Sequence, residues 1–555
     1  MKDLMKTVIV CMSALLLMVG TARAQQPIEK MVVNTTSGKV SGIIQEGTLA
    51  FLGIPYAKVE RFMPPQPVDK WDTVRVCDHW GPQVMQQTGG RQLSEEEMSE
   101  KNSCVLNVWT VNLSPDFPST KPLPVMLWLH GGGFDSGTSA WNPGMQLAKK
   151  NVVVVSINHR LNILGFLDLS AVSEKYKYSG NVGMLDVVQA LEWIRDNIAN
   201  FGGDPTNVTV FGESGGGGKV GTLMCMPQAK GLFHKAIIMS GTILNVNNHE
   251  MTQELGKAVL KELNISEQDV DRIKDVPYQE LYQAGQRAMA ASIGTRRPGT
   301  PMMWGFGPTP DGEVLLQQPF QPDFADISAG MPLLIGTTFN ELQRLHYNRE
   351  LTLEQARQEL TATFGDETDQ YIAAFAKAWP DYTPQDLLSI DWLFRPKTII
   401  TADAVTSTLH PQLSTLRSAL PLRSAKNPHP SNLYMYMFTW RSPVNNGSIH
   451  GHELKFCFNT LHHSPNELPQ PTEEDWKLAD TMSSVWAQFA HTGNPNIEGL
   501  PAWKPYTAEN GELMIFNHKC YIRNNPDREL EEIINRHCFK QLDEFRARES
   551  ARRVP

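Results

Sequence analysis

The feature that most constrains this chain is a glycine-flanked serine that directly follows a predicted strand. Residues 207–211 (Asn-Val-Thr-Val-Phe) predict the strand, and Gly212-Glu-Ser-Gly-Gly216 comes immediately after it. Two more glycines follow, and a helix can begin near Lys219. Glycines permit a strained turn that lifts the hydroxyl of Ser214 out of a sheet, and a helix N-terminus beyond it favours developing negative charge. The pattern predicts a strand-to-helix elbow with Ser214 at its tip.

A second glycine run lies upstream of the elbow. His130-Gly-Gly-Gly133 ends the apolar segment Val125–His130, which itself predicts a buried strand. Three glycines let backbone N–H groups approach a ligand with no side chain in the way, and this is the oxyanion-binding arrangement that a serine elbow requires. Either run alone is compatible with a flexible turn. Together, in this order and each after a strand, they predict a nucleophile with an oxyanion hole.

The segments around these motifs predict a doubly wound α/β fold. Val152–Ile157 and Ala236–Met239 are further apolar runs, typical of strands that are covered on both faces. Leu185–Ile198 carries apolar residues at helical spacing. The more polar stretch from Asn245 to Pro308 suits an insertion or lid over a site. No linker or composition shift marks a boundary, so we expect residues 25–555 to form a single large domain.

Composition and the N-terminus restrict the partners and the location of the chain. The 555 residues carry 50 basic and 59 acidic side chains, a net charge of −9, without a long basic run, which disfavours nucleic acid and anionic membranes as partners. Residues 1–24 read as a signal peptide, with Lys2 and Lys6 before an apolar stretch and Ala22-Arg-Ala24 as the cleavage site. No later stretch is apolar enough to span a bilayer. We therefore expect an exported protein, periplasmic or extracellular.

The cysteine pattern argues against a structural metal. Six cysteines follow the predicted signal peptide, and none has the C-x-x-C or Cys/His spacing of a zinc site. An even number in an exported chain permits disulfides, and Cys520–Cys538 closes the shortest loop. Buried free thiols are an equal alternative.

From about Gly38 to about Tyr506 the chain resembles the type B carboxylesterases, a family that includes cholinesterases and para-nitrobenzyl esterases. The similar segments occur in the family's order. They are Phe51–Ala57, Leu106–Trp109, Asn158–Leu161, Leu164–Leu167, Gly180–Asp186, Asn200–Pro205, Thr492–Asn496 and Trp503. The resemblance implies an α/β-hydrolase fold, with a large mostly parallel sheet, flanking helices and lid insertions. It also implies carboxylic ester hydrolysis without a cofactor or metal.

The resemblance also implies the partners of Ser214. Gly336-Thr-Thr-Phe-Asn-Glu341 looks like the family's G-T-N-x-D-E and implies Glu341 as the acid, with Asn340 in place of the usual Asp. His450-Gly-His-Glu453 looks like H-G-x-E and implies His450 as the base, which leaves His452 a structural role. The chain order Ser, Glu, His is that of an α/β-hydrolase.

Further roles follow from the same resemblance. The oxyanion donors are expected to be the backbone N–H groups of Gly132, Gly133 and Gly215, where Gly215 replaces the family's usual Ala and predicts a looser elbow. We interpret Glu213 as a buried structural acid, and Ser240 as a buttress for the Glu341–His450 pair.

One departure from the family concerns its N-terminal disulfide. Ser103 stands at the usual Cys position, and the partner Cys is absent as well. A Cys77–Cys104 bond from shifted positions is a hypothesis that mass spectrometry of non-reduced peptides tests.

The sequence leaves two other functions and the substrate open. The alternatives are a non-catalytic adhesion homologue on the same fold and an amidase or peptidase that uses the same triad. The adhesion homologues lose triad residues, whereas this chain keeps all three. Met289, Met302, Met303 and Trp304 could line an apolar pocket, although core packing is the simpler use of each. Arg296 and Arg297 suit a solvated lid loop better than an acidic substrate.

Overall fold

A computed structural model describes the chain over a series of ranges that exclude the predicted signal peptide. The described residues are 31–87, 93–94, 96–111, 121–294, 305–320, 326–342, 351–406, 432–463 and 468–537.

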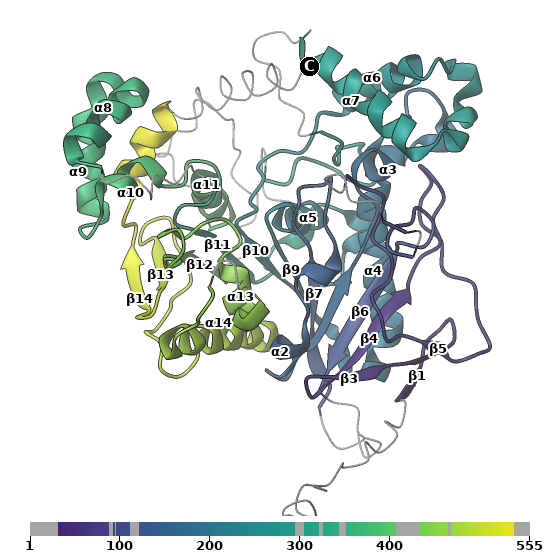
Figure 1. The fold of residues 1–555 in the computed structure, drawn as a ribbon, viewed down its shortest axis with the longest axis horizontal. Helices are drawn as coiled ribbons and strands as arrows, with labels where there is room; N and C mark the ends of the chain where they lie inside the picture. The colour runs from purple at the N-terminus through teal and green to yellow at the C-terminus, as the bar shows by residue number, and fades with distance from the viewer. Residues whose placement is uncertain are drawn as a thin grey trace, which may run out of the picture.

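An 11-stranded sheet forms the centre of the molecule (Figure 1). Its order is β14-β13-β12-β11-β10-β9-β7-β8-β6-β4-β3, parallel from β13 to β8 and antiparallel at both edges. A three-stranded sheet, β1-β2-β5, lies apart from it. The strands are β1 Val32–Asn34, β2 Lys39–Ser41, β3 Ile43–Gln45, β4 Thr48–Pro55, β5 Arg75–Val76, β6 Val105–Thr110, β7 Leu123–Leu129, β8 Val153–Ile157, β9 Gly203–Glu213, β10 Lys235–Met239, β11 Leu333–Thr338, β12 Leu433–Phe438, β13 Glu512–Phe516 and β14 Tyr521–Asn524.

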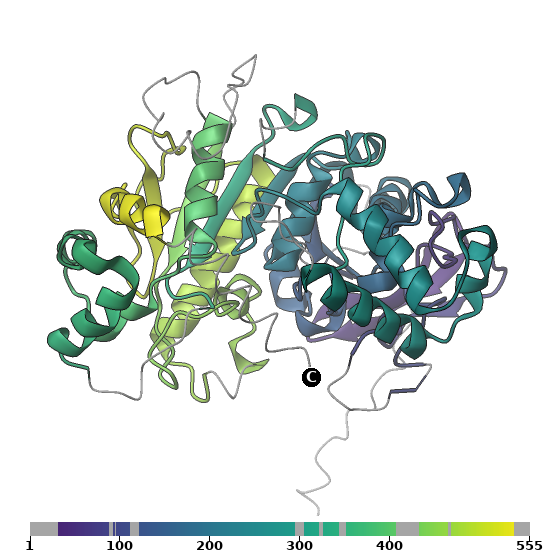
Figure 2. The same cartoon turned by 90° about the horizontal axis from the view of Figure 1, so that it is seen from above.

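Helices cover both faces of this sheet and extend beyond its ends (Figures 1 and 2). The α-helices are α2 Met145–Ala148, α3 Asn162–Phe166, α4 Val182–Asn197, α5 Gly215–Leu223, α6 His249–Glu262, α7 Tyr278–Gly294, α8 Leu353–Phe364, α9 Thr368–Ala378, α10 Pro384–Ser389, α11 Arg395–Thr406, α13 Glu453–Cys457 and α14 Glu473–Thr492. The 3₁₀ helices are η2 Ser139–Trp141, η3 Glu174–Tyr176, η4 Ser179–Asn181, η5 Ile198–Phe201, η6 Pro227–Ala229, η7 Glu267–Asp275, η8 Asp326–Ser328, η9 Gly365–Glu367 and η11 Leu461–His463.

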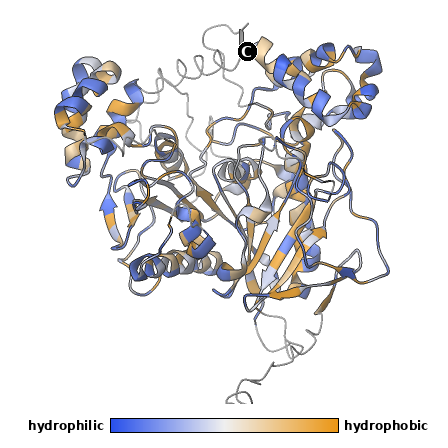
Figure 3. Cartoon of the chain, viewed as in Figure 1, coloured by the Kyte–Doolittle hydropathy of each residue, from blue (hydrophilic) through white to orange (hydrophobic). Residues whose placement is uncertain are grey.

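The apolar strands predicted from the sequence are confirmed, and their side chains alternate between two hydrophobic clusters. On β7, Met126 and Trp128 belong to a cluster with α2, α13 and α14. Val125, Leu127 and Leu129 face the opposite side and pack with residues of α4, α5 and α7. Figure 3 shows hydrophobic residues along the central strands. Because a parallel strand is covered on both faces, its sequence is apolar throughout.

Helix α5 is rich in glycine because it packs close to the sheet. Glycine disfavours a helix by about 1 kcal/mol per residue relative to alanine, yet Gly215–Gly218 open α5. A Cβ at Gly216 would collide with the carbonyl oxygen of Leu129 at the end of β7. Close approach of α5 to the sheet therefore requires glycine here, and it brings the elbow next to the loop that follows β7.

The stretch predicted to be an insertion contains α6, η7 and α7, which lie at one end of the molecule, whereas α8 and α9 lie at the other (Figures 1 and 2). Met289 on α7 is partly buried against the main core. Arg296, Arg297, Met302, Met303 and Trp304 lie outside the described residues. Across the parts of the chain with described structure, no helix combines the length and the hydropathy of a membrane span.

The disulfide suggested by the sequence, Cys77–Cys104, is not formed. Both cysteines are buried free thiols, and Cys104 Sγ lies 3.6 Å from Asp186 Oδ2 as a hydrogen-bond donor. Cys104 is held by the buried Arg160–Asp186 pair instead of by a second sulfur. Cys520 is also a free thiol, and Cys538 lies outside the described residues.

Candidate active site

Ser214 stands at the junction of β9 and α5 in the strained backbone conformation that the elbow predicts. Its φ is 56° and its ψ is −126°, a region that costs a residue with a Cβ about 1–3 kcal/mol. Its N–H donates to the carbonyl of Met239 at the end of β10 (2.9 Å), and its own carbonyl accepts from Gly218 (3.1 Å). Neighbouring strand and helix thus hold the turn on both sides.

Glu341 and His450 form a close, buried pair. Glu341 follows β11 and is 1% exposed, and its Oε2 lies 2.5 Å from His450 Nδ1. Its other oxygen accepts from the N–H of Thr338 (2.7 Å). The backbones pair as well, because the His450 N–H donates to the Glu341 carbonyl (3.1 Å). The imidazole therefore has one fixed orientation, with Nδ1 facing Glu341 and Nε2 facing away.

The free edge of this imidazole faces the elbow. His450 Nε2 lies 3.2 Å from Oε1 of Glu213, the residue directly before Ser214, without the geometry of a hydrogen bond. No hydrogen bond joins Nε2 to the Ser214 hydroxyl in this structure. Hydrogen bonds of this kind are commonly long in substrate-free enzymes and shorten when substrate binds.

Phe394 adds a further constraint on the imidazole, which the sequence analysis did not find. Its ring stacks on His450 with a centroid separation of 5.0 Å and an interplanar angle of 7°. The Asp391 carboxylate accepts backbone N–H bonds from Leu393, Phe394 and Arg395 and so fixes this turn. No motif marks Phe394, because the contact depends on the packing of two distant loops.

The electrostatics of the cluster favour a proton on His450. Burial by itself lowers the pKa of this imidazole, but the negative charges of Glu213 and Glu341 outweigh burial and raise it above its ordinary value. Burial raises the pKa of the Glu213 carboxyl, while the charge of His450 opposes that change. Glu213 thus contacts the imidazole directly and changes its pKa, in addition to being a buried acid.

Ser240 forms a hydrogen bond with Glu453, which lies three residues after His450. Its hydroxyl donates to Glu453 Oε1 (3.0 Å), and Glu453 in turn interacts electrostatically with Glu341 and His450. Burial and the charges of Glu213 and Glu341 hold the pKa of Glu453 well above its ordinary value. Glu453 is the first residue of α13 and Ser240 directly follows β10, so this bond joins the helix to the end of the strand. His452 is buried, which lowers its pKa to about 4, in keeping with the structural role assigned to it.

The two glycine motifs meet at the elbow. Gly132 and Gly133 have positive φ angles of 86° and 64°. The N–H of Gly215 is the first of α5 and has no acceptor within the helix. A Cβ at Gly215 would overlap the backbone of Gly133. Space, more than flexibility, accounts for glycine in place of the family's alanine, because the loop after β7 lies directly against the elbow.

Comparison with known proteins shows the family of the chain. The model of the carboxylesterase family matches residues 29–532. The chain belongs to the carboxylesterase family. The para-nitrobenzyl esterase of Bacillus subtilis (strain 168) is 33% identical over 90% of this chain and 97% of that protein. Carboxylesterase 1C of Mus musculus is 31% identical over 87% and 89% of the two chains.

A solved structure leads to the same conclusion. The structure of an esterase from Clostridium hathewayi, described as able to hydrolyse aliphatic aromatic polyesters, has a TM-score of 0.79 with 32% identity, covering 92% of this chain and 99% of that one. The carboxylesterase described here is therefore a carboxylic ester hydrolase of the α/β-hydrolase fold, as the sequence predicted.

A buried lysine lies behind the loop that follows β7 in this carboxylesterase. Lys219 on α5 is 0% exposed, and its ammonium donates to the carbonyl of His130, the residue before the three glycines (2.8 Å). Burial lowers its pKa to about 7. His130 and His159 stack nearby (5.3 Å between ring centroids), and burial and the charge of Lys219 lower the pKa of both. A charged residue among the glycines of α5 is the sequence signal that points to this group.

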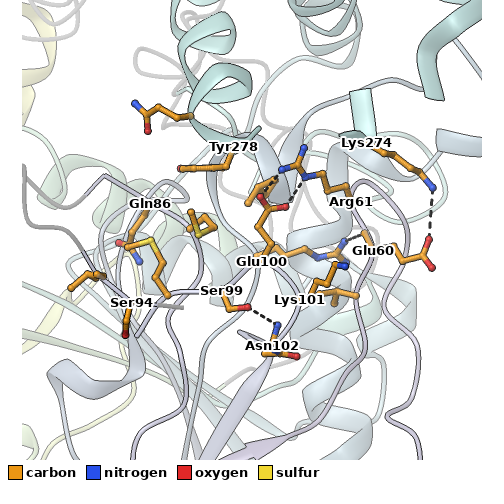
Figure 4. A pocket seen from close by; sticks show the side chains of 17 residues that line it. Glu60, Arg61, Gln86, Ser94, Ser99, Glu100, Lys101, Asn102, Lys274 and Tyr278 are labelled. Atoms are coloured by element: carbon orange, nitrogen blue, oxygen red, sulfur yellow. Dashed lines mark hydrogen bonds and ion pairs between the residues drawn. The ribbon is translucent and has the colours of Figure 1, made fainter. Parts of the chain in front are cut away.

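A cavity of about 1020 Å³ lies beside the same loop but contains none of Ser214, Glu341 and His450 (Figure 4). Gln86 on its wall exchanges two hydrogen bonds with the backbone of Gly137 (2.7 and 2.9 Å). Arg61 and Glu100 form a two-pronged ion pair across the cavity wall (2.5 Å for each bond; Figure 4). The cavity is thus linked to the glycine loop through Gln86, and it is distinct from the place where the elbow, Glu341 and His450 converge.

Proposed function

We propose that this chain is an exported serine carboxylesterase that hydrolyses small-molecule esters through an acyl-enzyme on Ser214. In this proposal His450 is the base, Glu341 orients it, and the N–H groups of Gly132, Gly133 and Gly215 form the oxyanion hole. The observation that carries the proposal is the 2.5 Å contact between Glu341 Oε2 and His450 Nδ1, with the opposite edge of the imidazole at the elbow.

The first half-reaction makes the acyl-enzyme. A serine hydroxyl is a weak nucleophile at neutral pH, so neutral His450 Nε2 removes its proton as Oγ attacks the ester carbonyl. Negative charge develops on the carbonyl oxygen, where backbone donors stabilise it more than they stabilise the ground state. Glu341 stabilises the imidazolium, which then protonates the departing alkoxide.

The second half-reaction regenerates the serine. Water takes the place of the alcohol, His450 Nε2 removes its proton, and the hydroxide attacks the acyl carbon. A second oxyanion forms in the same hole and collapses with release of the carboxylic acid. The imidazolium returns its proton to Ser214 Oγ, so the cycle needs no other reactant.

Active-site labelling tests the proposal against its two alternatives. A fluorophosphonate should label Ser214, identified by peptide mass spectrometry, and should abolish ester hydrolysis. Absence of labelling on a folded chain would support an adhesion homologue. Faster turnover of matched amides than of esters would support an amidase or peptidase.

Export and domain organisation are part of the proposal. Residues 1–24 have the charged start, apolar stretch and Ala-x-Ala end of a signal peptide. Cleavage after Ala24 predicts a mature chain that begins at Gln25 and folds as one catalytic domain over 25–555. N-terminal sequencing of the exported protein tests the boundary.

Replacing Glu213 should change the pH dependence of catalysis. Glu213→Gln removes a negative charge 3.2 Å from Nε2, so the pKa of His450 should fall. Because the base acts in its neutral form, the acidic limb of kcat/KM should move to lower pH by about one unit. The measurement is kcat/KM for a neutral ester between pH 5 and 10.

The control for this experiment is Glu512→Gln, which removes another buried carboxylate, on β13. Its pH profile should match that of the wild type. An unshifted acidic limb in Glu213→Gln would contradict the electrostatic role of Glu213.

Replacing Lys219 should weaken the oxyanion hole without removing any of its donors. Lys219→Met keeps the length of the side chain but frees the His130 carbonyl, so the glycine loop loses its anchor. We expect kcat to fall by about 10- to 100-fold with little change in KM, because misplaced donors lose transition-state contacts first.

Lys235→Met is the matched control, since Lys235 is also a buried lysine, on β10, but bonds to Asn207 at the opposite end of the sheet. It should cost stability with kcat preserved. Equal losses of kcat in both variants would show that the effect of Lys219→Met is not specific to the glycine loop, and would contradict this role of Lys219.

A further inference from the structure

Three side chains with metal-binding atoms converge on the surface, away from the elbow. Glu46 lies in the turn between β3 and β4, and His462 and His463 lie on η11. Nε2 of each histidine is 3.9 Å from Glu46 Oε1, and the three donor atoms lie within 4.8 Å of one another. We propose that Glu46, His462 and His463 form a binding site for a divalent transition-metal ion such as Zn²⁺.

The spacing fits a shared ion better than direct hydrogen bonds. A distance of 3.9 Å is too long for a hydrogen bond between imidazole and carboxylate. Zinc binds nitrogen and oxygen ligands at about 2.0–2.2 Å, so two ligands of one tetrahedral ion lie about 3.3–3.6 Å apart. The side chains are 42%, 40% and 39% exposed, so a small rotation of each closes the difference and leaves water to complete the coordination.

Neighbouring residues hold two of the ligands in place. Gln146 on α2 donates from Nε2 to Glu46 Oε2, which leaves Oε1 to face both imidazoles. The ring of His462 stacks on Trp476 of α14, with 6.0 Å between ring centroids and an angle of 25°. Helices α2 and α14 pack on the same face of the sheet (Figure 1). Two of the ligands are therefore already ordered in the folded chain, which lowers the entropy cost of binding an ion.

The ligand set determines which ions fit. Two neutral imidazoles and one carboxylate suit Zn²⁺, Ni²⁺ or Cu²⁺, whereas Mg²⁺ and Ca²⁺ prefer an all-oxygen shell. The Glu46 carboxylate also supplies negative charge beside the two imidazoles. The site should therefore discriminate against Mg²⁺.

The position of the site indicates a stabilising role. A bound ion would join the β3–β4 turn, at the edge of the sheet, to η11, which follows α13 and the His450 loop. An ion that binds the folded chain and not the unfolded one stabilises the fold by mass action. None of the three ligands contacts Ser214, Glu341 or His450 among the described contacts, so chemistry at the elbow should proceed without the ion.

Zinc titration of the untagged full chain, after treatment with a chelator, tests the proposal. Isothermal calorimetry and elemental analysis should give one Zn²⁺ per chain and no binding of Mg²⁺ at the same concentration. His462→Ala, His463→Ala and Glu46→Gln should each weaken Zn²⁺ binding by at least about tenfold. Zn²⁺ should raise the unfolding temperature of the wild type but not of the His462→Ala/His463→Ala double variant.

His79→Ala is the matched control, because His79 is an exposed histidine paired with a carboxylate, 2.7 Å from Asp78, without a second imidazole in the pair. It should bind Zn²⁺ as the wild type does. Unchanged Zn²⁺ stoichiometry in the double variant, or an equal loss in His79→Ala, would overturn the site. Loss of wild-type kcat at 25 °C after chelation would overturn its separation from the active site.

Discussion

Ser214→Ala should lower kcat on a small aryl ester by about 10⁴-fold or more, because it removes Oγ, the nucleophile that would carry the acyl group. His450→Ala should have an effect of the same size, since Ser214 Oγ then has no base. The double variant should be hardly slower than either single variant, because the two residues act as one unit. The measurement is single-turnover and steady-state hydrolysis of one ester by all three variants.

Folding has to be separated from chemistry in this comparison. Ser214→Ala keeps a Cβ in the same strained backbone and should unfold at nearly the wild-type temperature. His450→Ala leaves the 1% exposed carboxylate of Glu341 without its partner, a change that destabilises a fold. His450→Gln, which retains an amide near Glu341, is the better-matched variant. Near-wild-type turnover in a folded Ser214→Ala protein would refute the nucleophile.

Glu341→Gln should be the next most damaging change, with a loss of kcat of about 10³-fold. The amide has almost the same shape as the carboxyl group, but it does not stabilise an imidazolium. Its NH₂ group can donate to Nδ1 and so favour the tautomer that places the proton on Nε2. That tautomer offers no lone pair to the Ser214 hydroxyl. The loss should be seen in kcat, with KM close to that of the wild type.

Glu453→Gln is the control for this variant, since both carboxyl groups are buried next to His450. Burial and the charges of its acidic neighbours hold the pKa of Glu453 well above its ordinary value, which favours the neutral form of this carboxyl group. Exchange for a neutral amide should cost far less than Glu341→Gln. Equal losses in the two variants would contradict the assignment of Glu341 as the orienting acid.

Local patterns were sufficient for the elements that hold the site. The apolar runs of β7 and β8 and the helical spacing of α4 come from residues within one element, and both periodicities are visible in the sequence. The elbow could be predicted in the same way, because its glycines are adjacent in the chain. Glu341 and His450 could not, since periodicity does not single out one histidine among 15. Resemblance to a family supplied both.

Side-chain contacts between segments that are distant in the chain could not be predicted from the sequence. Ser240 was expected to buttress Glu341 and His450, and the sequence did not indicate that its hydroxyl bonds to Glu453. Cys77 and Cys104 were a candidate disulfide but are separate buried thiols. Lys219 was interpreted only as a residue near the start of a helix, although its ammonium donates to the carbonyl before the three glycines that follow β7.

The sequence by itself therefore determined the family and the α/β architecture, and it indicated the residues that we propose act at the elbow. Only the tertiary structure decided how they meet: Glu213 against Nε2, Phe394 stacked on the imidazole, and the Gly133 backbone in the space that a Cβ at residue 215 would need. The physical reason is that propensity and periodicity act over a few residues. The position of a side chain at the site depends on the close packing of strands and loops that are far apart in the chain.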